Sequence, residues 1–241
     1  IAIYAQWVQD IVDAPDTRAA LRERSAEAAD ILTAYENDLG EEIDYDFLRR
    51  AQLHDELVRA RNTGFMKDQV GPKTAAFAAL RERFKSEEAW NLARNHARKR
   101  VLIDDYNMEP IRMVQIVQKF GPVDWRVPAA HALYWSARGT DVGRMEVNFH
   151  NSASLDFVNA YRIVLQSVQE LWRFGDMYFN YLDVHEQQAG VYFVAPNPYF
   201  IPTYGNMLEE VVEASGIFES ESRAYRPFAA GYENFLRDAI R

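Results

Sequence analysis

EPIRMVQIVQKFGPVDWRVPAAHALYWSARG (residues 109–139) is the stretch that decides the fold, because its pattern predicts two successive amphipathic helices. Each half has a proline near its start and a glycine at its end, as is usual at helix termini. A compact pair of helices of this length is the building block of helical repeat proteins. The stretch therefore indicates an architecture, but it does not name a reaction.

Residues 110–139 resemble a tetratricopeptide-type helical hairpin. The resemblance rests on the paired short helices, the alanine-rich start of the second helix (PAAHA, 128–132) and the aromatic positions Tyr134 and Trp135. The W-x₂-L-G-x₂-Y pattern of that family is missing from the first helix. The resemblance implies binding of other proteins or peptides in a concave groove. GPVDWRVPAAHALYW (121–135) and QELWRFG (169–175) also resemble an uncharacterised group of bacterial helical proteins, which implies no activity.

The rest of the chain predicts a mainly α fold of antiparallel helical hairpins, bundle-like or repeat-like, with one small β-hairpin near residues 177–195. The hairpin is expected to pair MYFNYL (177–182) with VYFVA (191–195), because both segments are rich in aromatic and β-branched residues. One long helix is expected over residues 73–105, and further helices over 1–13, 155–174, 203–215 and from 225 to the end.

Aromatic residues divide the chain unevenly, with 10 of the 32 in residues 1–119 and 22 in residues 120–241. We therefore expect a boundary near Tyr106. It separates a charged part rich in Ala, Arg and Glu (1–106) from an aromatic-rich part that holds the β-hairpin (107–241). One continuous domain is the alternative.

Charge and composition limit the partners. The 27 basic and 36 acidic residues give a net charge of −9, which disfavours nucleic acid as a general partner. The chain has no cysteine, which excludes disulfides and thiolate sites but fits any compartment; an extracytoplasmic bacterial setting is slightly preferred. No apolar run is long enough to span a membrane. Because the chain starts at Ile1, a missing N-terminal signal or anchor is an open expectation.

His131 is the histidine with the most suggestive neighbours. Helical spacing places it beside Tyr134 and Trp135, with Asp124 and Arg126 just before its helix. A ligand-binding or acid–base histidine is one interpretation. A partly buried histidine bonded to a backbone carbonyl or to Asp124 is the favoured one.

Patterns for catalysis, metals and cofactors are missing from the sequence. None of the five histidines has an acidic residue three positions before it, as di-iron bundles require. Glu146 with His150, and His185 with Glu186, are interpreted as surface placements. No glycine-rich phosphate loop and no nucleophile motif occurs. We therefore predict no catalytic residue, metal ligand or cofactor.

Residues 192–204 (YFVAPNPYFIPTY) contain five aromatic residues and three prolines. This segment is either an aromatic arm that holds a neighbouring subunit, since exposed aromatics often anchor interfaces, or a connection that covers the helices. The covering connection is favoured.

Three functions compete, and the favoured one is a non-catalytic scaffold or assembly subunit whose partners are other protein subunits. The alternative is a small-molecule or peptide binding module with an aromatic pocket around Trp125, His131, Tyr134, Trp135 and Trp172. The third is an enzyme that uses His131 with Asp124. The predicted binding residues are Trp125, Arg126, His131, Tyr134, Trp135, Trp172, Tyr199 and Phe200.

Overall fold

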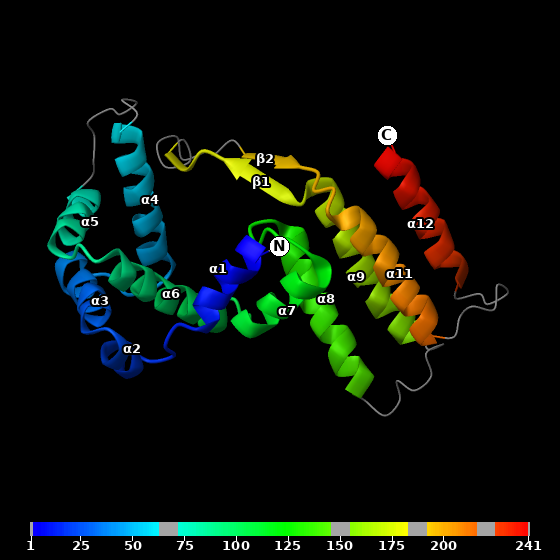
Figure 1. The fold of residues 1–241 in the computed structure, drawn as a ribbon, viewed down its shortest axis with the longest axis horizontal. Coiled ribbons are helices and arrows are strands. Elements are labelled where there is room, and N and C mark those ends of the chain that lie inside the picture. The colour runs from blue at the N-terminus through cyan, green and yellow to red at the C-terminus, as the bar shows by residue number, and fades with distance from the viewer. Residues whose placement is uncertain (1, 63–71, 146–154, 183–191, 216–224, 241) are drawn as a thin grey trace. The chain divides into compact units, whose positions relative to one another are not determined.

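The computed structural model describes residues 2–62, 72–145, 155–182, 192–215 and 225–240. This part of the chain forms eleven helices and one antiparallel pair of short strands (Figure 1). The prediction of a mainly α fold with one small β-hairpin is confirmed. The chain divides into two compact units, which we describe separately. The N-terminal unit comprises Ala2–Val114 with Phe179–Val191, and the C-terminal unit comprises Gln115–Tyr178 with Tyr192–Arg241.

Six helices build the N-terminal unit, as far as its residues are described. They are α1 (Ala2–Val12), α2 (Arg18–Arg24), α3 (Ala26–Leu39), α4 (Tyr45–Asn62), α5 (Pro72–Arg83) and α6 (Glu87–Asp104). Helix α3 packs against α2, α5 and α6, while α4 packs against α5 and α6, and α1 lies on α6. The next helix, α7 (Pro110–Phe120), contains the division between the units.

Large aromatic rings fill the core of the N-terminal unit. Tyr35, Phe47, Phe77 and Trp90 are fully buried, and Phe77 contacts each of the other three rings at centroid distances of 5.6–6.4 Å. Such ring pairs add to the free energy that burial of their apolar area contributes. The hydroxyl of Tyr35 donates to the carboxylate of Glu41, which also accepts hydrogen bonds from Arg50 and Lys73.

The single long helix predicted over residues 73–105 is wrong, because α5 ends at Arg83 and α6 begins at Glu87. Ser86 caps the new helix, since its Oγ accepts a hydrogen bond of 3.1 Å from the backbone N–H of Ala89. Trp90 Nε1 donates to the carbonyl of Phe84, 2.8 Å away, so the break is also fixed by the buried indole. Helical periodicity continues across the break, and for this reason the pattern alone missed it.

The C-terminal unit contains α8 (Pro128–Met145), α9 (Leu155–Phe174), β1 (Asp176–Phe179), β2 (Tyr192–Ala195), α11 (Phe200–Ser215) and α12 (Tyr225–Ile240). The closest packing is between α8 and α9; α11 packs against α9 and α12, and β2 contacts α9. Figure 1 shows α9, α11 and α12 running side by side.

Two helix ends in this unit differ from prediction. Gly139 was expected to end its helix, but α8 continues to Met145, because Gly139 has no left-handed conformation that would terminate it. The last long connection was expected to stay extended until Thr203, but α11 begins at Phe200. Pro202 then lies in the first helical turn, where the missing N–H costs no hydrogen bond.

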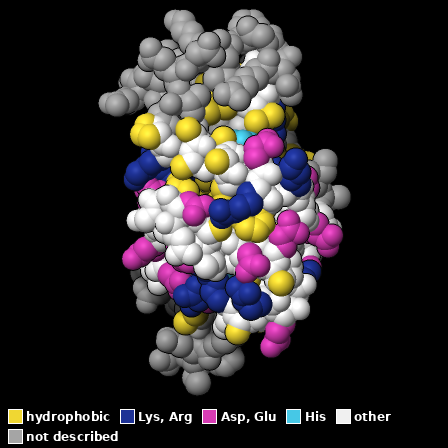
Figure 2. Space-filling model, turned by 90° about the vertical axis from the view of Figure 1, so that its left-hand side faces the viewer, with side chains coloured by type: hydrophobic (Ala, Val, Ile, Leu, Met, Phe, Trp, Pro, Cys, Tyr) yellow, Lys and Arg dark blue, Asp and Glu magenta, His cyan; other side chains and the backbone are white. Residues whose placement is uncertain are grey.

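Charged side chains of both signs are interspersed on the face shown in Figure 2. Ion pairs within the N-terminal unit include Arg22 with Asp30 at 2.9 Å and Arg83 with Asp38 at 3.0 Å. These pairs are exposed, so each contributes little to stability.

Candidate binding groove

The turn before α8 and the first two turns of α8 bring four of the predicted site residues together. The ring of Trp125 meets that of Tyr134 edge-on at 6.4 Å, and Tyr134 meets Trp135 at 5.1 Å. Tyr134 is fully buried, whereas Trp135 is 44% exposed. The cluster therefore has a buried base and one ring at the surface.

His131 is held by the backbone of the same turn. Its Nε2 lies 2.9 Å from the carbonyl oxygen of Trp125, so the carbonyl accepts a hydrogen bond in the tautomer that protonates Nε2. The carboxylate of Asp124 is bonded to Arg126 and Met177 instead. The His131–Asp124 pair that general acid–base chemistry would require is therefore not formed in this structure.

Asp124 and Arg126 form a clasp that reaches β1. Arg126 binds the carboxylate of Asp124 through Nε and Nη2, at 2.8 and 2.6 Å, and Nη2 also donates to the carbonyl of Met177 at 2.7 Å. The N–H of Met177 donates to Asp124 at 3.1 Å. Burial alone would raise the pKa of Asp124, but these hydrogen bonds outweigh it and lower the pKa. The predicted binding residue Arg126 thus has a structural partner.

The three remaining predicted residues lie elsewhere in the C-terminal unit. Trp172 packs edge-on against Phe235 of α12 at 5.3 Å. Tyr199 is partly exposed and covers Gly121, where a Cβ atom would lie 2.4 Å from the Tyr199 ring. Phe200 is fully buried. The structure therefore gathers Trp125, His131, Tyr134 and Trp135 into one cluster and places Trp172 in the packing of α12.

A groove of about 450 Å³ opens between α8 and α9, and sequence reasoning missed it. We call it the α8–α9 groove. Its lining consists of Val127, Pro128, Ala129, Ala132, Ile163, Gln166, Ser167, Glu170, Phe174 and Val194. On α8 the lining side chains are small, and on α9 they recur at helical spacing along one stripe. The two helices pack against each other, and the small side chains of α8 leave the groove open beside that contact. Ile163 and Phe174 are 53% and 48% exposed on its wall.

A signal for this groove was present in the sequence. Tyr161, Val164, Leu165, Val168 and Leu171 form the buried stripe of α9. Ile163 and Phe174 are large apolar residues outside that stripe, and they share a second stripe with Gln166, Ser167 and Glu170. An apolar surface wider than one core-facing stripe indicates a second contact.

The β-hairpin extends the apolar surface from one end of the groove. Val194 of β2 lines the groove and is 40% exposed, while Tyr192 and Phe193 are 63% and 68% exposed. Tyr178 of β1 is also exposed. Side chains alternate along a strand, so Tyr192 shares the face of Val194, whereas Phe193 lies on the opposite face. Exposed apolar side chains beside an apolar groove are typical of an interaction site.

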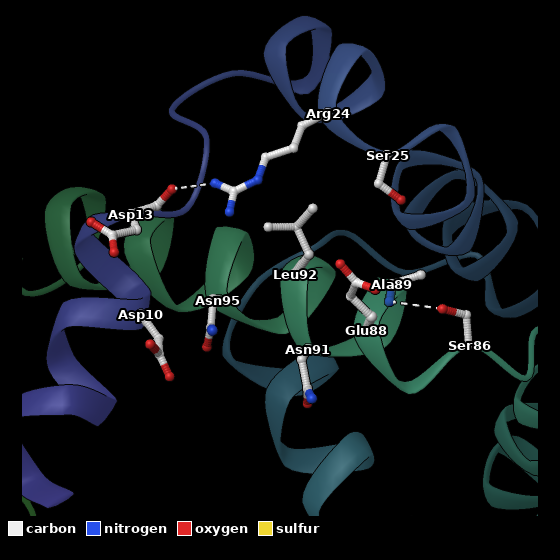
Figure 3. Close-up of a pocket in the computed structure, with 10 residues that line it drawn as sticks. All are labelled: Asp10, Asp13, Arg24, Ser25, Ser86, Glu88, Ala89, Asn91, Leu92 and Asn95. Carbon is white, nitrogen blue, oxygen red and sulfur yellow. Dashed lines mark hydrogen bonds between the residues drawn. The ribbon is translucent and has the colours of Figure 1, made fainter.

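A second hollow, of about 410 Å³, lies in the N-terminal unit and is mostly polar (Figure 3). The carboxylates of Asp10 and Asp13 accept hydrogen bonds from Gln6 and Gln9, both 2.8 Å long. Arg24 donates to the backbone carbonyl of Asp13, and this contact is visible in Figure 3. Because these polar groups bind one another, we place the candidate site at the apolar groove.

Within the described ranges, no cluster of histidine, aspartate and glutamate could hold a metal ion. Glu146, His150, His185 and Glu186 lie outside these ranges. None of the helices in the described ranges has both the length and the apolar character that crossing a membrane requires.

Comparisons of the chain with models of protein families, with curated proteins and with solved structures give no match.

Proposed function

We propose that this protein is a non-catalytic scaffold or assembly subunit that binds an apolar segment of another protein in the α8–α9 groove. The observation that carries the proposal is that an open apolar groove lies beside a hairpin with exposed aromatic side chains. Ile163 and Phe174 stand in the wall, and Val194 joins the groove to the exposed strand. Covering such a surface removes apolar area from water, which drives association.

The groove also indicates the chemistry of its partner. Glu170 is the one charged residue in the described lining. Its ion-pair partner Arg173, 3.3 Å away, is shared with Asp238, so one cation faces two carboxylates. The side chain of Glu170 is 39% exposed. We therefore expect the bound segment to be apolar, with a lysine or arginine placed to meet Glu170. This also suits the net charge of the chain, which is −9.

Affinity capture of the tagged full-length protein from its own cells, with mass spectrometry of the bound proteins, tests the proposal. The test variant is Ala132→Trp, which fills the groove from an exposed position on α8. The matched control is Ala230→Trp, the same change at an exposed position of α12 outside the groove.

We expect a stoichiometric partner with the wild type and with Ala230→Trp, and its loss with Ala132→Trp. If all three proteins are recovered alone, or if Ala132→Trp retains the partner, the groove does not bind a protein segment. Far-ultraviolet circular dichroism of the variants separates loss of the groove from loss of the fold.

A small-molecule ligand is the second candidate. The groove volume falls within the range of about 300–1,000 Å³ that is common for ligand pockets. Native mass spectrometry of the protein purified from its own cells would reveal a bound molecule. A ligand whose mass is lost in Ala132→Trp but kept in Ala230→Trp would favour this second candidate.

A further inference from the structure

The hairpin has two edges, and side chains close one of them. Within one residue of a β-strand, the N–H and the C=O point towards the same edge. At Met177 of β1, the N–H is bound by Asp124 and the C=O by Arg126, at 3.1 and 2.7 Å. Both groups therefore point away from β2. Covering a strand edge in this way prevents another strand from pairing with it.

The register of the hairpin shows what the other edge offers. The strands Asp176–Phe179 and Tyr192–Ala195 each have four residues and pair in antiparallel fashion, which places Met177 opposite Val194. Since the backbone groups of Met177 point outward, this is a non-hydrogen-bonded pair. The N–H and C=O of Val194 must then also point outward, at the outer edge of β2.

The edge at Val194 lacks three of the usual protections. Among the described residues, no hydrogen bond from outside the hairpin reaches its backbone. The strand YFVA contains no charged residue and no proline, the two features that commonly block edge strands. The side chain of Val194 lines the α8–α9 groove, so a strand added beside it would lie next to an apolar hollow.

We infer that the outer edge of β2 accepts a third strand from a partner protein, an extended apolar segment that carries a lysine or arginine. Its main chain would bond to the N–H and C=O of Val194, and its alternate side chains would enter the α8–α9 groove. This inference rests on the proposed function and specifies the conformation of the bound segment.

Charge decides between a partner and a second copy of the chain. Pairing of two β2 strands around a twofold axis would bring together two molecules that each carry −9. It would also place no basic residue of β2 near Glu170, since YFVA is uncharged. A basic segment of another protein is attracted to the same surface.

A displayed library of random peptides of about six residues, the common length of a strand, provides the probe. Selection on the wild-type protein, with counter-selection on Ala132→Trp, should enrich peptides in which apolar residues alternate and a lysine or arginine recurs. Enrichment of an i, i+3, i+4 pattern would indicate a helical segment and would overturn the inference. Failure to enrich any peptide would overturn it as well.

The selected peptide is then tested on the main chain of β2. Amide hydrogen exchange by NMR should show a Val194 N–H that exchanges freely in the protein alone and is protected in the complex. Val194→Pro removes this donor without removing a bond inside the hairpin and should weaken binding by about tenfold or more, the cost of a lost hydrogen bond. The control Val194→Ile keeps the N–H, the branched Cβ and the apolar character and should bind within about twofold.

Two results would separate this inference from the proposed function. If the peptide binds and Ala132→Trp abolishes binding, but Val194 exchanges as before, the groove binds proteins while the strand addition is refuted. If the protein sediments as a dimer without peptide and Val194 is already protected, a second copy occupies the edge. Should Val194→Pro misfold, the exchange of Val194 in the wild type still decides the question.

Discussion

Replacing Glu41 by glutamine is expected to destabilise the N-terminal unit near neutral pH and to matter much less in acid. The Glu41 carboxylate accepts hydrogen bonds of 2.6 Å from Arg50 Nε, Arg50 Nη2 and the hydroxyl of Tyr35, and it also pairs with Lys73. A glutamine side chain has one acceptor oxygen and adds a donor, so Arg50 would lose part of its bidentate contact.

The magnitude follows from the pKa of the carboxyl. The hydrogen bonds from Arg50, together with those from Lys73 and Tyr35, outweigh partial burial and lower the pKa of Glu41 from 4.5 to about 2. At about 1.4 kcal/mol for each pH unit, the contribution could reach about 3 kcal/mol. Screening reduces this, because Lys73 is 57% exposed and the cluster reaches the surface. We therefore expect a loss of about 1–2 kcal/mol.

The sign of the pH dependence follows from the lowered pKa. Stability from a carboxyl with a lowered pKa is present above the unfolded value of 4.5 and is lost as the pH falls towards about 2. The difference between wild type and Glu41→Gln should thus be full at about pH 7 and less than half as large at about pH 3. Asp55, whose pKa is also lowered to about 2, affects both proteins equally and cancels in the difference.

Urea unfolding measures this difference, with Trp90 as reporter because it is fully buried in the same core as Tyr35. Incorporated fluorotryptophan gives each of the five tryptophans its own NMR signal, so the unit can be followed alone. The control is Glu42→Gln, the same change at the exposed neighbouring position. Equal midpoints for the two variants at about pH 7, or a difference that does not change with pH, would refute the reasoning.

Four further substitutions test the packing and one helix cap. Gly121→Ala should cost about 2–4 kcal/mol, because its φ of +119° strains an L-residue and the new Cβ would meet the ring of Tyr199. Gly139→Ala, which meets no atom within 4 Å, should be neutral or stabilising in the same urea titration. Phe235→Ala should cost about 3–5 kcal/mol and expose α12 to proteolysis, since Phe235 is fully buried. Ser86→Ala removes a helix cap and should cost about 1 kcal/mol, with faster amide exchange in the first turn of α6; unchanged exchange there would contradict the capping role.

The candidate site was only partly predictable from sequence. Helical spacing predicted His131 beside Tyr134 and Trp135, since residues three and four apart lie on one face of a helix. In the structure Tyr134 meets Trp135, and His131 is bonded to the carbonyl of Trp125. The same reasoning could not place Trp172, because its neighbour Phe235 is distant in sequence. Nor could it locate the α8–α9 groove, whose two walls and strand come from three separate elements.

The sequence alone was enough to predict the mainly α fold with one small hairpin. Apolar periodicity, prolines near helix starts and segments rich in aromatic and β-branched residues are local signals. They predicted α7, α9 and the hairpin without knowledge of the fold. Local signals failed to predict a helix end where that end depends on a group that is buried or distant in sequence. The break before α6 depends on a tertiary contact of the buried Trp90 indole as well as on the cap at Ser86.

Only the tertiary structure decided which surfaces remain uncovered. A residue such as Ile163 or Val194 reads as a core residue in the sequence, and its exposure depends on which elements pack beside it. In the same way, the backbone contacts of Met177 depend on the clasp of Asp124 and Arg126, which connects segments more than 50 positions apart. Burial and backbone pairing are properties of the assembled chain, since each depends on groups that sequence proximity does not bring together.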